Sequence, residues 1–194
     1  MKLLIFGSSL CRYLRDFDKA KNRVIAGVNV RFIYRHFSGL SFHDFIDNTP
    51  LIDDVLACKP DLVLVIFGAN SIVRARPKRI ILENCRDFYQ ILYDKLQVVN
   101  PRAKIIAHQA PLRFLYKFEH DTPLPEDFRK IRKALNERIR LLPTKHFMLN
   151  ISGVNKLDDE RLFKDGIHFK RRGLEIQFNL ILEKLDHVVE HYFA

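Results

Sequence analysis

The sequence contains no tryptophan, few cysteines and no long hydrophobic run. The three cysteines, Cys11, Cys58 and Cys85, are an odd number without the paired spacing of a metal site, so we interpret them as reduced thiols of an intracellular protein. The apolar run Leu3–Phe6 is too short for a signal peptide and lacks a small-residue cleavage site after it. No stretch approaches the roughly 20 apolar residues of a membrane span. The sequence therefore predicts a soluble, unexported protein.

The sequence also lacks the common motifs of nucleotide and metal binding. No Gly-x-Gly-x-x-Gly or Gly-Lys-Ser/Thr motif follows the first predicted strand, and the histidines have no zinc-ligand spacing. Asp16 and Asp18 resemble the carboxylate pair of a phosphotransferase, but they lie near the end of a predicted helix rather than a strand. The acidic run Asp158–Glu160 could bind a cation, although such a run is typical of a helix start. We therefore expect neither a cofactor nor a metal ion.

What the sequence does contain is the composition of one globular domain with an excess of positive charge. It has 194 residues, of which 47% are hydrophobic and 29% charged, and its formal net charge is +10. Such an excess is commonly a solvated surface, but it could also bind nucleic acid, an anionic membrane or an acidic substrate. The sequence does not indicate an oligomeric state. The basic residues cluster at two places: Arg74, Arg76, Lys78 and Arg79, and then Lys170, Arg171 and Arg172.

Short β-type runs alternate with helical stretches along the whole chain. The run 61–67 is apolar throughout, which is typical of a parallel strand covered on both faces. The alternation predicts one α/β domain over residues 1–194, with an open five-stranded parallel sheet and helices on both faces. In such sheets the site lies beyond the carboxyl ends of the strands. The expected strands are 2–6, 29–34, 61–67, 104–108 and 146–151, and the expected helices are 10–19, 41–58 with a break near Pro50, 79–98, 125–142 and 170–192.

Candidate residues follow four of these strands. Ser9 follows the first, where a serine on a strand-to-helix turn can act as a nucleophile and its N–H can face an oxyanion. Ser8 or Ser9 could instead simply cap the helix. Gly39 and Asn70 could donate hydrogen bonds to the same oxyanion, although glycine and asparagine are also common turn residues. Three such donors in separate loops favour an acyl-transfer site.

Asp165 and His168 complete the predicted site near the end of the chain. A carboxylate three residues before a histidine can accept a hydrogen bond from Nδ1, which fixes the tautomer and leaves Nε2 to take a proton from Ser9. The alternative is a structural histidine near a helix start. Taken together, the residues predict a catalytic triad of Ser9, His168 and Asp165.

The order of these motifs resembles that of the SGNH (GDSL-type) hydrolase family, over nearly the whole chain. The motifs are Gly7-Ser8-Ser9-Leu10, Gly39, Gly68-Ala69-Asn70 and Asp165-x-x-His168. The resemblance implies a three-layer, flavodoxin-like fold and a cofactor-free esterase. It also implies a nucleophile at Ser9, an oxyanion hole formed with Gly39 and Asn70, and a triad completed by Asp165 and His168.

The chain departs from the family pattern at two positions. The usual Gly-Asp-Ser reads Gly7-Ser8-Ser9, and the usual Gly-x-Asn-Asp reads Gly68-Ala69-Asn70-Ser71, so each motif lacks an aspartate beside a catalytic group. These losses bear on the rigidity of the turns and on efficiency rather than on the assignment of roles. A short, basic chain with reduced cysteines is also similar to the esterase-like domains carried by some retroelement proteins.

The sequence thus leads to one main hypothesis and two alternatives. The main hypothesis is a serine esterase acting on a small acyl ester, acetyl or short-chain, with an anionic substrate suggested by the nearby basic residues. The first alternative is a catalytically weak or inactive module on the same fold that binds nucleic acid or an anionic membrane. The second is an unrelated flavodoxin-like protein whose motif matches arise by chance.

Overall fold

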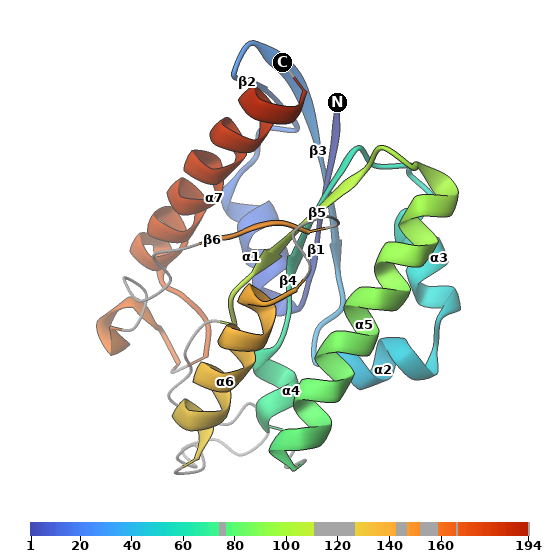
Figure 1. Ribbon diagram of the computed structural model, residues 1–194. Coiled ribbons are helices and arrows are strands. Elements are labelled where there is room, and N and C mark those ends of the chain that lie inside the picture. The colour runs from blue at the N-terminus through green and yellow to red at the C-terminus, as the bar shows by residue number, and fades with distance from the viewer. Residues whose placement is uncertain (74–76, 111–126, 143–146, 152–158, 166, 194) are drawn as a thin grey trace.

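The computed structural model describes residues 1–73, 77–110, 127–142, 147–151, 159–165 and 167–193 (Figure 1). A six-stranded sheet in the order β2-β3-β1-β4-β5-β6 forms its centre. The strands are β1 (Lys2–Gly7), β2 (Asn22–Ile25), β3 (Val28–His36), β4 (Leu62–Ile66), β5 (Lys104–His108) and β6 (Phe147–Ile151).

Five of the strands are parallel, which confirms the expected α/β sheet. The sixth, β2, was not predicted; it pairs antiparallel with β3 at the edge and adds to the five parallel strands. Ala26 and Gly27 join β2 to β3 with φ of 45° and 77°. Two successive positive φ values are the requirement of a tight two-residue hairpin turn. Alanine rarely adopts this conformation, so the hairpin turn has no clear signal in the sequence.

Helices cover both faces of the sheet, as expected (Figure 1). On one face lie α1 (Ser9–Phe17) and α7 (Arg171–Tyr192). The other face carries α2 (Phe42–Asp47), α3 (Pro50–Leu56), α4 (Ala69–Val73), α5 (Lys78–Val99) and α6 (Phe128–Arg140). The expected helix 41–58 is divided into α2 and α3, and Pro50 is the first residue of α3. None of the described helices is long and apolar enough to cross a membrane.

Alternate residues of β1 supply both halves of the core. Leu4 and Phe6 are fully buried among α2, α3 and α5, while Leu3 and Ile5 are fully buried against α1 and α7. In a chain without tryptophan, phenylalanines provide the aromatic packing. The Phe6 ring, for example, lies edge-on to Phe45 with ring centroids 5.1 Å apart. Burial of every residue of β4 explains why its run is apolar throughout.

The carboxyl ends of β1 and β4 lie side by side, and the chain turns there from β1 directly into α1. Gly7 permits this close approach, because a Cβ at this position would stand 2.7 Å from the carbonyl oxygen of Ile66. The Ser8 N–H then donates to the same carbonyl at 3.2 Å. The two serines that follow β1 are therefore held against the end of β4.

Candidate active site

Ser9 is the first residue of α1 and is buried, with 5% of its surface exposed. Ser8 occupies the N-cap position, but its side chain makes no capping hydrogen bond. The alternative that Ser8 serves as a side-chain cap is therefore wrong. The hydroxyl of Ser9 stands at the strand-to-helix turn that was predicted for it.

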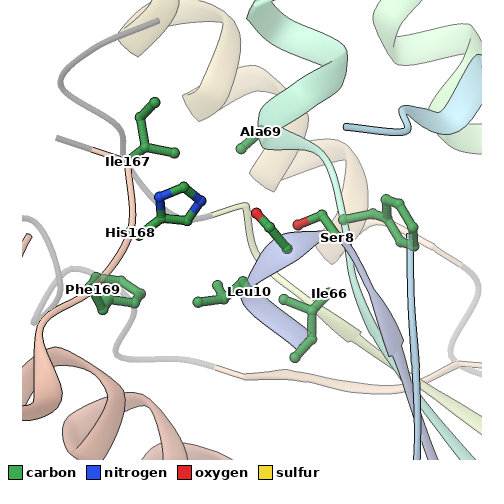
Figure 2. Close-up of a pocket in the computed structure, with 9 residues that line it drawn as sticks. Ser8, Leu10, Ile66, Ala69, Ile167, His168 and Phe169 are labelled. Carbon is green, nitrogen blue, oxygen red and sulfur yellow. The ribbon is translucent and has the colours of Figure 1, made fainter. Parts of the chain in front are cut away.

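A small pocket at the carboxyl edge of the sheet brings Ser9 and His168 together (Figure 2). Its empty space, with the open solvent at its mouth included, is about 380 Å³. In Figure 2, the imidazole of His168 lies across the pocket from Ser8. Ser9 and His168, from opposite ends of the chain, thus line the same pocket. The pocket is lined by Ser8, Ser9, Leu10, Ile66, Phe67, Ala69, Ile167, His168 and Phe169.

Asp165 fixes the imidazole of His168 through its side chain. Its Oδ2 lies 2.7 Å from Nδ1 of His168. The other oxygen, Oδ1, accepts the backbone N–H groups of Ile167 at 3.0 Å and His168 at 2.6 Å. Because an ionised carboxylate can only accept, the hydrogen must be on Nδ1, and Nε2 of a neutral ring is then an acceptor. This tautomer is the one that a general base needs.

The carboxyl of Asp165 is ionised despite its partial burial. Burial raises its pKa. Hydrogen bonds from the His168 ring and from the N–H groups of His168 and Ile167 together lower the pKa by more than burial raises it, so the net shift is downward. The side chain of His168 is 15% exposed and that of Asp165 is 44% exposed. The orienting carboxylate is therefore more exposed to solvent than the base.

A tight backbone loop presents these two residues. Phe163 and Phe169 form an antiparallel bridge, and Lys164 N–H donates to the His168 carbonyl at 2.9 Å. The two phenylalanine rings pack with centroids 4.5 Å apart. Gly173 in α7 leaves room for this pair, because a Cβ there would lie 2.7 Å from Cδ1 of Phe169. The loop is thus anchored on the first turn of α7.

The two remaining oxyanion candidates lie in segments that a hydrogen bond connects. Asn70 lies in α4, and its Nδ2 donates to the carbonyl of Leu40, the residue after Gly39, at 2.9 Å. Gly39 is buried and has φ of +84°, which only glycine adopts readily. Neither Gly39 nor Asn70 is among the described residues that line the pocket, whereas Ala69 is. The structure therefore brings Ser9, His168 and Asp165 together. Asn70 directly follows the lining residue Ala69 in sequence, and Gly39 directly precedes Leu40, the residue to which Asn70 is bonded.

Serine stands at positions 8 and 71, where the SGNH-type motifs have aspartate, and the two serines have different contacts. The Ser71 hydroxyl is buried and accepts the N–H of Phe42, the first residue of α2, at 3.1 Å. It forms a second link between α4 and the segment that carries Gly39. Ser8 makes no comparable side-chain bond to the helix. Of these two serines, only Ser71 therefore makes a described side-chain hydrogen bond to a neighbouring helix.

Sequence reasoning missed Tyr13. Its ring lies 4.8 Å from the ring of His168, centroid to centroid. Tyr13 comes four residues after Ser9 in α1, and residues at this spacing share one face of a helix. The spacing was visible in the sequence, but its meaning depends on where the loop of His168 lies.

The other polar groups that were weighed in the sequence have structural partners. The Asp18 carboxylate pairs with Arg23 and accepts the hydroxyl of Tyr34 at 3.1 Å. Asp159 accepts the N–H of Arg161 at 2.9 Å at the start of the 3-10 helix Glu160–Leu162, as expected for a helix-start acid. Asp158 lies outside the described residues.

The predicted basic clusters lie on the surface as far as they are described. Lys78, Lys170, Arg171 and Arg172 are exposed, and Arg79 is exposed and paired with Glu83 at 3.2 Å. Arg74 and Arg76 lie outside the described residues.

The fold is that of the SGNH (GDSL-type) hydrolases. It is similar to a carbohydrate esterase family 3 structure from Talaromyces cellulolyticus, with TM-score 0.68 and 18% identity over 98% of this chain and 99% of that one. A GDSL-like lipase from Bacteroides thetaiotaomicron has TM-score 0.66 and 18% identity, covering 98% and 88%. Axe2, an acetylxylan esterase from Geobacillus stearothermophilus, has TM-score 0.65 and 17% identity, covering 95% and 93%.

These similarities establish the fold, because each covers nearly the full length of both chains. No protein-family model matches the sequence, and no curated protein matches it either. The flavodoxin-like architecture that the motif order implied is thereby confirmed. The resemblance to esterase-like domains of retroelement proteins stays a prediction.

Proposed function

We propose that this chain is a serine ester hydrolase with Ser9 as nucleophile, His168 as general base and Asp165 as the residue that orients the base. The observation that carries the proposal is that Ser9 and His168 line one pocket, with the Nδ1 of His168 held by Asp165. A support of a different kind is that structures of the same fold are described as lipases and esterases.

In the proposed reaction, Ser9 Oγ attacks the ester carbonyl and its proton passes to Nε2 of His168. The tetrahedral intermediate then collapses, the alcohol leaves with that proton, and the acyl group stays on Ser9. A water molecule, deprotonated by the same nitrogen, releases the acid. Proton transfer needs Ser9 Oγ within hydrogen-bond reach of Nε2, a contact that is often long in ligand-free sites and shortens with substrate.

The oxyanion of the intermediate would be bound by backbone and amide N–H groups. The Ser9 N–H stands at the start of α1, where the helix dipole favours negative charge. The Nδ2 of Asn70 carries two hydrogens, and its bond to Leu40 fixes the plane of the amide. The Gly39 N–H is proposed as the third donor. Each such donor contributes about 3 kcal/mol of transition-state stabilisation in acyl transfer.

The acyl group is proposed to be acetyl or another short chain. The pocket is small, and its walls near Ser9 are the apolar side chains of Leu10, Ile66 and Ala69. A long acyl chain would need a much longer apolar channel. Acetylxylan esterase activity in a structure of the same fold agrees with this size.

The proposal is tested by hydrolysis of p-nitrophenyl acetate. We expect Ser9→Ala and His168→Ala to lower kcat by roughly 10³-fold or more, because each removes one partner of the proton transfer. His187→Ala is the matched control, since His187 is exposed on α7 and far along the chain from the pocket. Equal rates in the wild type and both pocket variants would contradict an esterase.

A second function, binding of nucleic acid or an anionic membrane, is favoured by the basic residues at the start of α7. Lys170, Arg171 and Arg172 are exposed at the N-terminus of this helix, where the dipole disfavours positive charge, so helix stability does not account for them. Binding of this kind should weaken steeply with added salt. Absence of binding to an oligonucleotide and to anionic vesicles at low salt would exclude it.

A further inference from the structure

Two cations converge on the phenol of Tyr13, beside His168. The Nη2 of Arg12 donates to Tyr13 Oη at 3.1 Å, and Lys164 Nζ lies 3.5 Å from the same oxygen. Both charges also contact the ring, with Arg12 Cζ at 5.0 Å and Lys164 Nζ at 4.6 Å from its centroid. Because both nitrogens lie close to the same oxygen, Arg12 Nη2 and Lys164 Nζ can be no farther apart than the sum of their distances to Tyr13 Oη. Like charges this close repel each other unless an anion lies between them.

Neither cation is neutralised within the part of the chain that the structure describes. No carboxylate there pairs with Arg12 or with Lys164, whereas two other basic residues nearby are paired. Arg15 contacts Asp16 at 2.8 Å and Arg161 contacts Asp159 at 2.8 Å. The contrast within one helix and one loop separates Arg12 and Lys164 from ordinary surface charges.

The field of Arg12 also extends to the end of β3. The pKa of His36 is lowered first by its burial and then by Arg15 and Arg12, while Asp16 acts in the opposite direction.

The hydroxyl of Tyr13 adds a hydrogen-bond donor to the two cations. Its oxygen accepts from Arg12 and lies 3.5 Å from Lys164 Nζ, so its own O–H is left to donate to an acceptor. An anion placed there would meet two charges and one hydroxyl.

The position of Tyr13 indicates which part of a substrate would carry such an anion. The Tyr13 and His168 rings are 4.8 Å apart. The leaving oxygen of an ester must approach His168 to receive its proton, so groups on the alcohol lie closer to Tyr13 than groups on the acyl chain.

We infer that Arg12, Tyr13 and Lys164 bind a carboxylate or phosphate group carried by the alcohol of the ester substrate. This inference rests on the proposed esterase function and adds the charge of the substrate. Arg12 supplies a planar pair of donors that suits either anion, and Lys164 supplies a second point charge. Both side chains come from segments that also carry a triad residue, so the anion site is fixed relative to the reacting atoms.

The test compares esters that differ in the charge of the alcohol. The anionic substrates are 4-acetoxybenzoate and 4-acetoxyphenyl phosphate, and the neutral one is methyl 4-acetoxybenzoate. For each enzyme form, the ratio of kcat/KM for an anionic ester to that for the neutral ester is measured, which cancels effects on chemistry alone. We expect Arg12→Gln and Lys164→Gln each to lower at least one ratio by roughly threefold to tenfold. High salt should lower the wild-type ratio as well.

Arg15→Gln and Arg161→Gln are the matched controls, because each removes one positive charge from the same helix or the same loop. Their ratios should stay within twofold of the wild-type value. Ratios that are unchanged in Arg12→Gln and Lys164→Gln, or that fall equally in the controls, would overturn the inference while leaving the esterase intact.

A binding measurement separates this inference from the proposed function. The Ser9→Ala variant cannot turn over substrate by the proposed route, so its affinity for 4-hydroxybenzoate can be followed by titration. The additional change Arg12→Gln should weaken this affinity by roughly threefold to tenfold, whether or not any ester is hydrolysed. Absence of hydrolysis by the wild type would contradict the esterase, and an unchanged affinity would contradict the anion site.

Discussion

The carboxylate of Asp165 holds three N–H groups of its own loop, and the 2.7 Å contact from its Oδ2 to Nδ1 of His168 is one of them. The same side chain therefore shapes the loop and sets the tautomer of the base. A change at Asp165 should affect both properties, and they can be measured separately.

Asp165→Asn should lower kcat for p-nitrophenyl acetate by roughly 10²- to 10⁴-fold, because an amide can donate to Nδ1 and so favour the wrong tautomer. The loop should largely keep its backbone bonds, since the amide oxygen can still accept them. Asp159→Asn is the control, as Asp159 is a partly exposed acid that pairs with Arg161 and makes no described contact with His168. A kcat within twofold of wild type for Asp165→Asn would show that Asp165 does not orient the base.

The contacts of Asp165 also have a defined pH dependence. Its pKa is below the ordinary value of 3.8 because the hydrogen bonds outweigh burial. Its contribution to stability is therefore fully present above pH 3.8 and is lost as pH falls through the lower folded value. Acid unfolding of wild type and Asp165→Asn should differ in this window and run parallel above it. Parallel curves throughout would show that the carboxylate is not stabilised in the folded state.

His108 at the end of β5 should make stability depend on pH in a higher range. It is fully buried, and burial lowers its pKa from 6.5 to about 4, with a weaker opposing effect from the carbonyl of Gln109. Between these values the unfolded chain binds more protons than the folded one, so stability falls as pH falls from 6.5 toward 4. The wild type should lose about 1–2 kcal/mol of unfolding free energy between pH 7 and pH 5.

Urea unfolding at the two pH values tests this, with His108→Gln as the variant and His187→Gln as the exposed control. The variant should lose the His108 share of the pH dependence, even though its stability at pH 7 will be lower. The control should keep it. An equal pH dependence in His108→Gln and the wild type would contradict a neutral buried histidine.

Ser71→Ala should destabilise the fold by about 1–2 kcal/mol, because it leaves the buried N–H of Phe42 without its 3.1 Å acceptor. It should also reduce kcat, since it loosens α4 from the segment of Gly39. Ser38→Ala removes a hydroxyl from the exposed neighbour of that segment and serves as the control. Unfolding free energies of the two variants that agree within error would show that the Ser71 contact carries no net stability.

Gly68→Ala should cost more stability than the same change at Gly27, although both glycines have positive φ, 118° and 77°. A Cβ at Gly68 would stand 3.0 Å from both Ala110 Cβ and Leu135 Cδ2, while a Cβ at Gly27 would meet nothing within 4 Å. We expect a loss of roughly 1 kcal/mol at Gly27 and at least 2–3 kcal/mol at Gly68. Equal losses in thermal or urea unfolding would show that the backbone conformation, and not the packing, sets the cost.

The parts of the fold that could be predicted are those in which the sequence pattern and the burial agree. The run 61–67 is apolar because both faces of β4 are covered, and Pro50 marked the break between α2 and α3. The β2–β3 hairpin was missed because its turn uses Ala26, a residue with little preference for φ of 45°. The helix α4 was missed because five residues are too few to show a helical period.

The candidate site was predictable to the extent that its residues occupy fixed places on the sheet. Ser9 follows β1, and His168 precedes α7, so the topology brings them to one edge. The contact of Tyr13 with His168 depends on the loop between Phe163 and Phe169, which has no counterpart in the periodicity of the sequence. The bond from Asn70 to Leu40 likewise joins α4 to a loop far from it in sequence, and no local pattern encodes that contact.

Serine at positions 8 and 71 alters the electrostatic potential that an approaching ester meets. An aspartate at either position would put a further negative charge beside the nucleophile or behind the oxyanion donors, whereas a hydroxyl adds none. The described residues that line the pocket include no acidic side chain. Repulsion of an anionic substrate is correspondingly weaker, and the two departures from the family motif favour the same sign of substrate charge as the cations around Tyr13.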